Sequence, residues 1–186
     1  MDNDVIEIRW HGRGGQGAIT AAKITAKTAF QAGYGGVVMA PTFGTERRGA
    51  PVHTSLKISK TKIWDLSPIE EPDIVIVLDH LILEEVDVTA GIKPNGLLIL
   101  NTPKEHSHYN FNDIRLATAN VSDLAASTGL KKGVVNTGII GVFSKATQLL
   151  KIDDLATTIE EEFLNRKAKE NAEAARRCYE HTITQS

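Results

Sequence analysis

The stretch HGRGGQGAITAAK, residues 11–23, decides the fold, because it joins a strand pattern to a helix pattern through a glycine-rich turn. Before it, residues 5–10 (VIEIRW) place apolar side chains at every second position, which is the period of a strand. After it, residues 18–31 carry apolar side chains at helical spacing and end before Gly33. Strand, turn and helix form the first half of a β-α-β unit.

Strand and helix patterns continue to alternate along the chain. Residues 73–78 (DIVIVL) are a nearly unbroken apolar run, typical of a strand that is covered on both faces in a parallel sheet. Further strands are predicted over residues 37–40, 96–100 and 115–119, and helices that begin at residues 136–137, 153–154 and 165. Residues 52–58 alternate and are followed by a turn and the pair at 63–64, which predicts a β-hairpin with one solvated face.

These patterns predict an α/β fold that is Rossmann-like, with a mainly parallel sheet flanked by helices and a β-hairpin extension. With 186 residues and 41% hydrophobic residues, the chain is long enough for one substantial core, so we expect a single α/β domain over residues 1–186.

The charge and hydropathy of the chain argue against several kinds of partner. The net charge of -2 gives no electrostatic footprint for nucleic acid, so we expect no nucleic-acid partner. No run approaches the roughly 18 apolar residues that a membrane span requires. The acidic start MDNDVIEI lacks the order of a secretion signal, so we expect a soluble, cytoplasmic protein without membrane contact.

The sequence holds one cysteine, Cys178. One thiol cannot form an internal disulfide or hold an iron–sulfur cluster or a four-thiolate zinc ion within this chain. We therefore expect any electron transfer to use another polypeptide.

The glycine turn fits the pattern G-x-G-x-x-G over Gly12, Arg13, Gly14, Gly15, Gln16 and Gly17. Glycine lets main-chain amides and the start of a helix face an anion. A nicotinamide dinucleotide site also needs an acid after the second strand, where this chain has VVMAP. The residues that follow the last glycine also do not fit a P-loop. An anion site and a tight packing turn stay equally open on spacing alone.

A second group of candidate residues lies in ERRGAP, residues 46–51. Arg47 and Arg48 stand on a predicted loop, and arginine presents a fork of donors that matches phosphate or carboxylate. Together with Arg13 they predict a site for a polyanionic nucleotide, although a solvated charge pair is the simpler alternative.

The remaining polar residues show no catalytic constellation. His106 and His108 resemble a metal-binding pair only in spacing, and no further ligands are evident, so we expect no metal site. Asp79 and His80 close a buried strand, where parallel-sheet proteins place functional groups, but no nucleophile accompanies them. We therefore expect no catalytic residue in this chain.

Five segments in order, HGRGGQG, ERRGAPV, EPDIVIVLD, LLILNT and VVNTGIIGVFSKAT, resemble the gamma subunit of 2-oxoacid:ferredoxin oxidoreductases, pyruvate and ketoisovalerate enzymes above all. The resemblance runs from about residue 5 to residue 179. It implies a non-catalytic subunit, inert alone, of a pyruvate synthase-type enzyme that converts a 2-oxoacid and coenzyme A to acyl-CoA. Thiamine diphosphate and iron–sulfur clusters would lie on partner subunits only.

The resemblance also implies a place for coenzyme A. The gamma domain would cover the active-site entrance and help to hold coenzyme A, whose phosphates would suit the glycine turn, Arg13, Arg47 and Arg48. Thr137, at a predicted helix start, would add further amides. The implied partners are the alpha, beta and delta subunits, with ferredoxin reached through the complex.

Two other functions stay open on the sequence. One is an independent Rossmann-type nucleotide-binding oxidoreductase, which binding of NAD or NADP would indicate. The other is a purely structural assembly subunit whose glycine turn touches protein alone. Replacing Arg47 and Arg48 by alanine distinguishes this second alternative, because subunit association would then fall while the Michaelis constant for coenzyme A stays unchanged.

Overall fold

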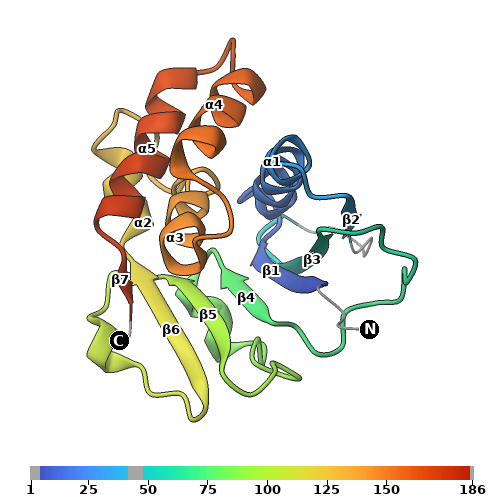
Figure 1. The fold of residues 1–186 in the computed structure, drawn as a ribbon. Coiled ribbons are helices and arrows are strands. Elements are labelled where there is room, and N and C mark those ends of the chain that lie inside the picture. Colours follow the sequence, from blue (N-terminus) through green and yellow to red (C-terminus); the bar gives the residue numbers. More distant parts are fainter. Residues whose placement is uncertain (1–4, 42–47, 185–186) are drawn as a thin grey trace.

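The computed structural model describes residues 5–41 and 48–184 and shows helices layered on a seven-stranded sheet (Figure 1). The strands are β1 (Ile6–Arg13), β2 (Gly36–Pro41), β3 (Pro51–Ser59), β4 (Ile74–Val77), β5 (Gly96–Asn101), β6 (Ile114–Ala119) and β7 (Ile183–Thr184). The helices are α1 (Ala18–Gln31), α2 (Val121–Ala126), α3 (Gly138–Thr147), α4 (Ile152–Glu162) and α5 (Ala168–Glu180), with short 3-10 helices η1 (His80–Glu84) and η2 (His106–His108).

The strand order is β2-β3-β1-β4-β5-β6-β7. Strands β1, β4, β5 and β6 run parallel to one another, while β3 is antiparallel to both of its neighbours and β7 is antiparallel to β6. Since β2 is also antiparallel to β3, it points the same way as β1. The predicted α/β fold with a mainly parallel sheet is confirmed.

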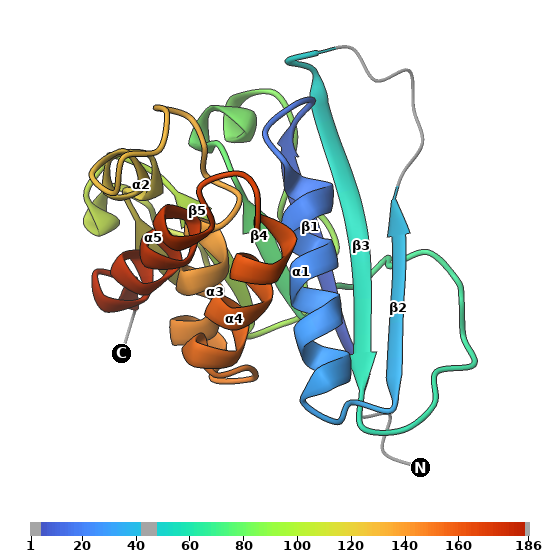
Figure 2. The ribbon, with the colours of Figure 1, turned by 90° about the horizontal axis from the view of Figure 1, so that it is seen from above.

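The predicted hairpin is wrong in its pairing. Residues 63–64 lie outside the sheet, and β3 instead fills the gap between β2 and β1, with Ile58 opposite both Val37 and Ile6. Leu56 and Ile58 are fully buried, as an interior strand requires. Figure 2 shows β2 at the outer edge of the sheet, beyond β3.

The two faces of the sheet are covered differently. The five α-helices lie on one face, where the main core includes Trp10 of β1 packed against Phe143 of α3 with ring centroids 6.2 Å apart (Figure 1). On the other face, Val75, Val77 and Leu98 pack against η1 and the connecting segments. This second layer explains why β4 is apolar at every position.

Helices α3 and α5 make a very close contact. A Cβ atom added at Gly141 of α3 would lie 1.9 Å from the carbonyl oxygen of Ala175 on α5. Ala172 and Ala175 of α5 are buried small residues, and they allow this close helix docking.

Within the described residues, no helix has both the length and the apolar character needed to cross a bilayer.

Candidate functional site at the glycine turn

The glycine turn lies where the chain leaves β1 and enters α1, at the carboxyl ends of the parallel strands. Gly15 and Gly17 have φ angles of 93° and 85°, a backbone region that favours glycine. Gly17 is the residue before α1, and a Cβ there would lie 3.0 Å from the side chain of Asn136. Around Gly15 a Cβ would meet nothing within 4 Å. Gly17 thus serves packing, whereas Gly15 faces open space.

The structure brings the glycine turn next to residues 48–51, the described part of ERRGAP (residues 46–51), which we call the arginine loop. The amide of Gly14 donates to the carbonyl of Ala50 over 2.9 Å, and the amide of Gly49 donates to the carbonyl of Gly14 over 3.1 Å. These bonds continue the β1–β3 ladder beyond the strands. Arg48 is exposed beside this junction. Arg47, which the sequence placed in the same site, lies outside the described residues.

Arg13 forms ion pairs within the protein. Its Nε lies 2.9 Å from the Oδ2 atom of Asp79, and its Nη2 lies 2.5 Å from the Oε1 atom of Glu85. A further bond joins Nη1 to the carbonyl of Gly49. Hydrogen bonds to Glu85 and Asp79 raise the pKa of Arg13 above its ordinary value. Its guanidinium therefore ties the glycine turn to the segment that follows β4.

Gln16 extends this network with both ends of its amide. Its Oε1 accepts from the amide of Arg13 over 2.7 Å, and its Nε2 donates to Asp79 over 3.2 Å. Burial favours the neutral form of Asp79, but hydrogen bonds from the Leu81 amide, Arg13 and Gln16 outweigh burial and lower the pKa of Asp79. The carboxylate stays ionised and fixes the turn.

Thr137 precedes α3, but its hydroxyl does not cap that helix. The side chain is fully buried and donates to the Oδ1 atom of Asn171 on α5 over 3.1 Å. A ligand contact by Thr137 would therefore have to use its main chain. Its neighbour Asn136 is the residue that reaches the glycine turn.

A cavity of about 310 Å³ opens beside the turn, at the ends of β4, β5 and β6. It is lined by polar groups that end or follow a strand, among them Asp79, His80, Asn101 and Asn120, and also by Gln16. In open α/β sheets, ligands bind in the crevice outside these strand ends. Asn101 and Asn120 were not predicted as site residues from the sequence, although Asn101 belongs to the segment LLILNT; their position directly after predicted strands is the signal that could have indicated them.

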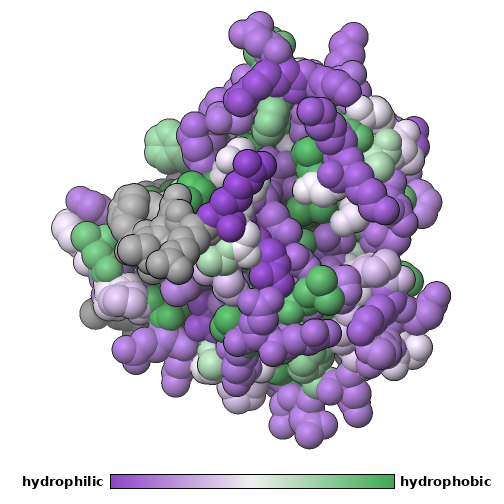
Figure 3. Space-filling view, turned by 180° about the vertical axis from the view of Figure 1, so that it is seen from behind, coloured by the Kyte–Doolittle hydropathy of each residue, from purple (hydrophilic) through white to green (hydrophobic). Residues whose placement is uncertain are grey.

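Figure 3 views the molecule from this side and shows mainly hydrophilic side chains, with apolar ones in small separate groups. Among the described residues, no three histidine, cysteine or acidic side chains are grouped so that they could hold a metal ion. His108 is exposed and His106 contacts Thr118 over 3.1 Å. Any ligand at this end of the sheet would therefore meet main-chain amides and polar side chains.

The family model for pyruvate ferredoxin/flavodoxin oxidoreductase matches residues 7–181. The chain belongs to this family. The resemblance seen in its sequence is thereby confirmed, and the matched range includes the glycine turn, the arginine loop and every strand but the last.

Members of the pyruvate ferredoxin/flavodoxin oxidoreductase family resemble the chain over almost its whole length. The common gamma subunit of pyruvate/ketoisovalerate oxidoreductases from Pyrococcus abyssi is 44% identical over 182 residues, which cover 96% of this chain and 97% of the relative. Pyruvate synthase subunit PorC from Methanothermobacter thermautotrophicus is 41% identical over 176 residues, 95% of each chain.

Solved structures of the family support the same assignment. Pyruvate oxidoreductase subunit PORC from Thermotoga maritima superimposes with a TM-score of 0.84 at 30% identity, covering 99% of this chain and all of that one. The 2-oxoglutarate:ferredoxin oxidoreductase from Magnetococcus marinus, solved with 2-oxoglutarate, coenzyme A and succinyl-CoA, contains the same fold in 32% of its chain. The TM-score is 0.77 and the identity 18%, so that likeness concerns the fold alone.

Proposed function

We propose that this chain is the gamma subunit of a 2-oxoacid:ferredoxin oxidoreductase, of the pyruvate type. The observation that supports it best is the likeness to gamma and PorC subunits, which covers at least 95% of both chains at more than 40% identity. The subunit is catalytically inert alone, since oxidative decarboxylation of the 2-oxoacid belongs to partner subunits. It works in the cytoplasm with alpha, beta and delta subunits, and ferredoxin meets the assembled complex.

The redox groups would lie on those partners. We assign iron–sulfur clusters to other subunits, because cluster ligation requires several thiolates. Thiamine diphosphate is assigned to them as well, as the family resemblance implies. The single Cys178 is fully buried, and burial raises the pKa of its thiol to about 12. A protonated, buried thiol is a poor cluster ligand.

We further propose that the domain covers the active-site entrance and that its glycine turn helps to bind coenzyme A. Two features support a phosphate at this place. The first-turn amides of α1 point toward the turn with no side-chain cap, and Gly15 leaves open space beside them. Exposed Arg48 and its neighbour Arg47 would add charge. The candidate set remains Gly12–Gly17, Arg47, Arg48 and Thr137.

Arg13 and Gln16 enter this proposal in a supporting role. Both side chains already donate hydrogen bonds to the carboxylate of Asp79. A phosphate could accept those hydrogen bonds only by displacing this carboxylate. We therefore expect Arg48 and Arg47 to contribute more to coenzyme A affinity than Arg13 does.

The test is a titration of the purified chain with coenzyme A and with NAD, followed by kinetics of the assembled complex. We expect weak binding of coenzyme A, none of NAD, and no turnover by the chain alone. Replacing Arg47 and Arg48 by alanine should raise the Michaelis constant for coenzyme A at least about tenfold, since one charge-assisted bond contributes about 1.5–3 kcal/mol and each 1.4 kcal/mol is about a factor of ten. Arg166→Ala, far along the chain at the entry to α5, is the matched control.

Micromolar binding of NAD would favour an independent nucleotide-binding oxidoreductase instead. An unchanged Michaelis constant together with lost subunit association would mean that the arginine loop serves assembly only.

A further inference from the structure

Strand β2 forms an open edge of the sheet. Among the described residues, β3 is the only strand that pairs with it. Residues 36–41 (GVVMAP) carry no charge, and the strand has neither the lysines nor the bulge with which proteins usually protect an edge; its one edge-protecting residue is the terminal Pro41. Val37, Val38 and Met39 are half-buried and Ala40 is exposed. The outward main-chain groups of such a strand favour pairing with another strand.

The opposite edge of the same sheet differs. There β7 has only two residues, Ile183 and Thr184, and a very short edge strand offers little template for pairing. The sheet is thus protected at one end and open at the other.

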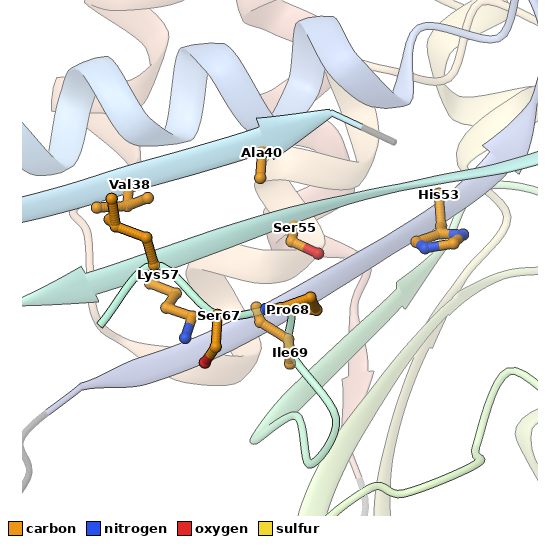
Figure 4. Close-up of a pocket in the computed structure, with 9 residues that line it drawn as sticks. Val38, Ala40, His53, Ser55, Lys57, Ser67, Pro68 and Ile69 are labelled. Carbon is orange, nitrogen blue, oxygen red and sulfur yellow. The ribbon is translucent and has the colours of Figure 1, made fainter. Parts of the chain in front are cut away.

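A cavity of about 290 Å³ lies directly beneath β2 on the face away from the helices (Figure 4). Val38 and Ala40 project toward it from β2, and Leu66, Pro68 and Ile69 form its other apolar wall. The wall is therefore built partly by the edge strand itself.

The cavity also carries little net charge. Lys57, at its floor, lies 2.9 Å from the Oε1 atom of Glu7 and 3.3 Å from the Oδ2 atom of Asp65. These two carboxylates offset its charge. The cavity therefore suits an apolar side chain better than an anion.

Two large apolar residues of the segment after β3 face solvent. Leu66, which lines this cavity, is 72% exposed, and Trp64, two residues before it in the chain, is 80% exposed. An open edge, an apolar cavity and exposed apolar side chains thus occur together. A strand added at β2 would gain main-chain hydrogen bonds, and its alternate side chains would lie over the cavity.

We propose that β2 pairs with β2 of a second copy of this chain, antiparallel, to form one continuous sheet. Antiparallel pairing of a strand with itself obeys two-fold symmetry, so the same edge is complementary to its copy. The axis then stands perpendicular to the sheet, so Leu66 and Trp64 of both copies lie on the same face of the continuous sheet. Because β2 carries no charge, the two strands do not repel each other.

The available area indicates a weak dimer. A tryptophan side chain buries roughly 150–250 Å² at a contact, whereas a standard interface covers roughly 800 Å² per partner. Trp64 and Leu66 supply part of that area and the strand ladder supplies more. We therefore expect association in the micromolar range.

Sedimentation velocity of the purified chain across the micromolar range tests the proposal. We expect a reversible monomer–dimer equilibrium. Leu66→Lys should raise the dimer dissociation constant at least about tenfold, because it places like charges opposite each other across the axis. Leu66 is largely exposed, so the variant should fold, which circular dichroism checks. Leu164→Lys, a change at a residue 75% exposed between α4 and α5, is the matched control and should leave the constant unchanged.

Hydrogen exchange identifies the strand that pairs. Amides of residues 36–40 should become more protected as concentration rises, while those of β5, inside the sheet, should not change. A chain that stays monomeric throughout would overturn the proposal. So would a dimer that Leu66→Lys and Leu164→Lys weaken equally, or one without added protection at residues 36–40.

Discussion

Single glycines in the turn separate packing from binding. Gly17 combines a positive φ with a tight contact to Asn136, whereas Gly15 has a positive φ and open space. We predict that Gly17→Ala lowers the free energy of unfolding by about 1–3 kcal/mol, because both strain and a clash act there. Gly15→Ala is the matched control and should lower the free energy of unfolding by less, since only the strain of a positive φ acts there and no clash is added. Urea denaturation of both variants measures the difference, and equal losses would contradict the assigned role of Asn136.

His11 makes stability sensitive to acid. Burial, helped by Arg9 and His53, lowers the pKa of His11 from 6.5 to about 3. As the pH falls, His11 is therefore protonated in the unfolded chain before it is protonated in the folded chain. The stabilisation is fully present above the pKa of the unfolded state and is lost as the pH drops toward the pKa of the folded state.

We predict that, between about pH 6 and pH 4.5, the free energy of unfolding falls by up to about 1.4 kcal/mol per pH unit from this group. His11→Gln should flatten that slope, and exposed His181→Gln should not. Urea titrations at several pH values measure both slopes. A wild-type slope that survives in His11→Gln would show that other groups cause it.

The candidate site was predictable only in part. The glycine turn and the arginine loop were both expected, and their contact through Gly14 and Ala50 follows once β3 pairs with β1. The ion-pair partners of Arg13 were not predicted. Asp79 and Glu85 lie 66 and 72 residues further along the chain, and the strand order brings them next to Arg13. No local spacing records such a contact.

Among the elements, strands with two covered faces were the most predictable and β3 the least. The apolar runs of β4 and β5 indicate burial on both sides, whatever their neighbours are. The alternation over residues 52–58 correctly predicted a strand, but alternation does not say with which strand it pairs. The turn at residues 60–61 indicated residues 63–64 as the partner, which is wrong. A turn reports on nearby residues only, whereas β1 and β3 are distant in the sequence.

Helix packing supplies a prediction in which two effects oppose each other. By helix propensity alone, Gly141→Ala would stabilise α3 by about 1 kcal/mol. The Cβ would however lie 1.9 Å from the Ala175 carbonyl, so α5 would have to move. We predict a net loss of about 1–3 kcal/mol, as for other overpacked cores, measured by thermal or urea unfolding. Net stabilisation would mean that the helices separate easily.

The whole molecule was predicted to be a single domain over residues 1–186, and its unfolding tests that. The pairing of β1 with β4 joins the two halves of the sheet, β2-β3-β1 and β4-β5-β6-β7, into one. We therefore expect one cooperative unfolding transition, seen alike by far-ultraviolet circular dichroism and by tryptophan fluorescence from buried Trp10. Two separated transitions would divide the chain into independent units.

The position of β3 between β1 and β2 has a consequence during synthesis. A nascent chain that has emerged only as far as β2 holds two strands that point the same way with a strand-wide gap between them. Neither can satisfy its inner edge until residue 59 leaves the ribosome, so this side of the protein closes in a single step once β3 is available rather than strand by strand.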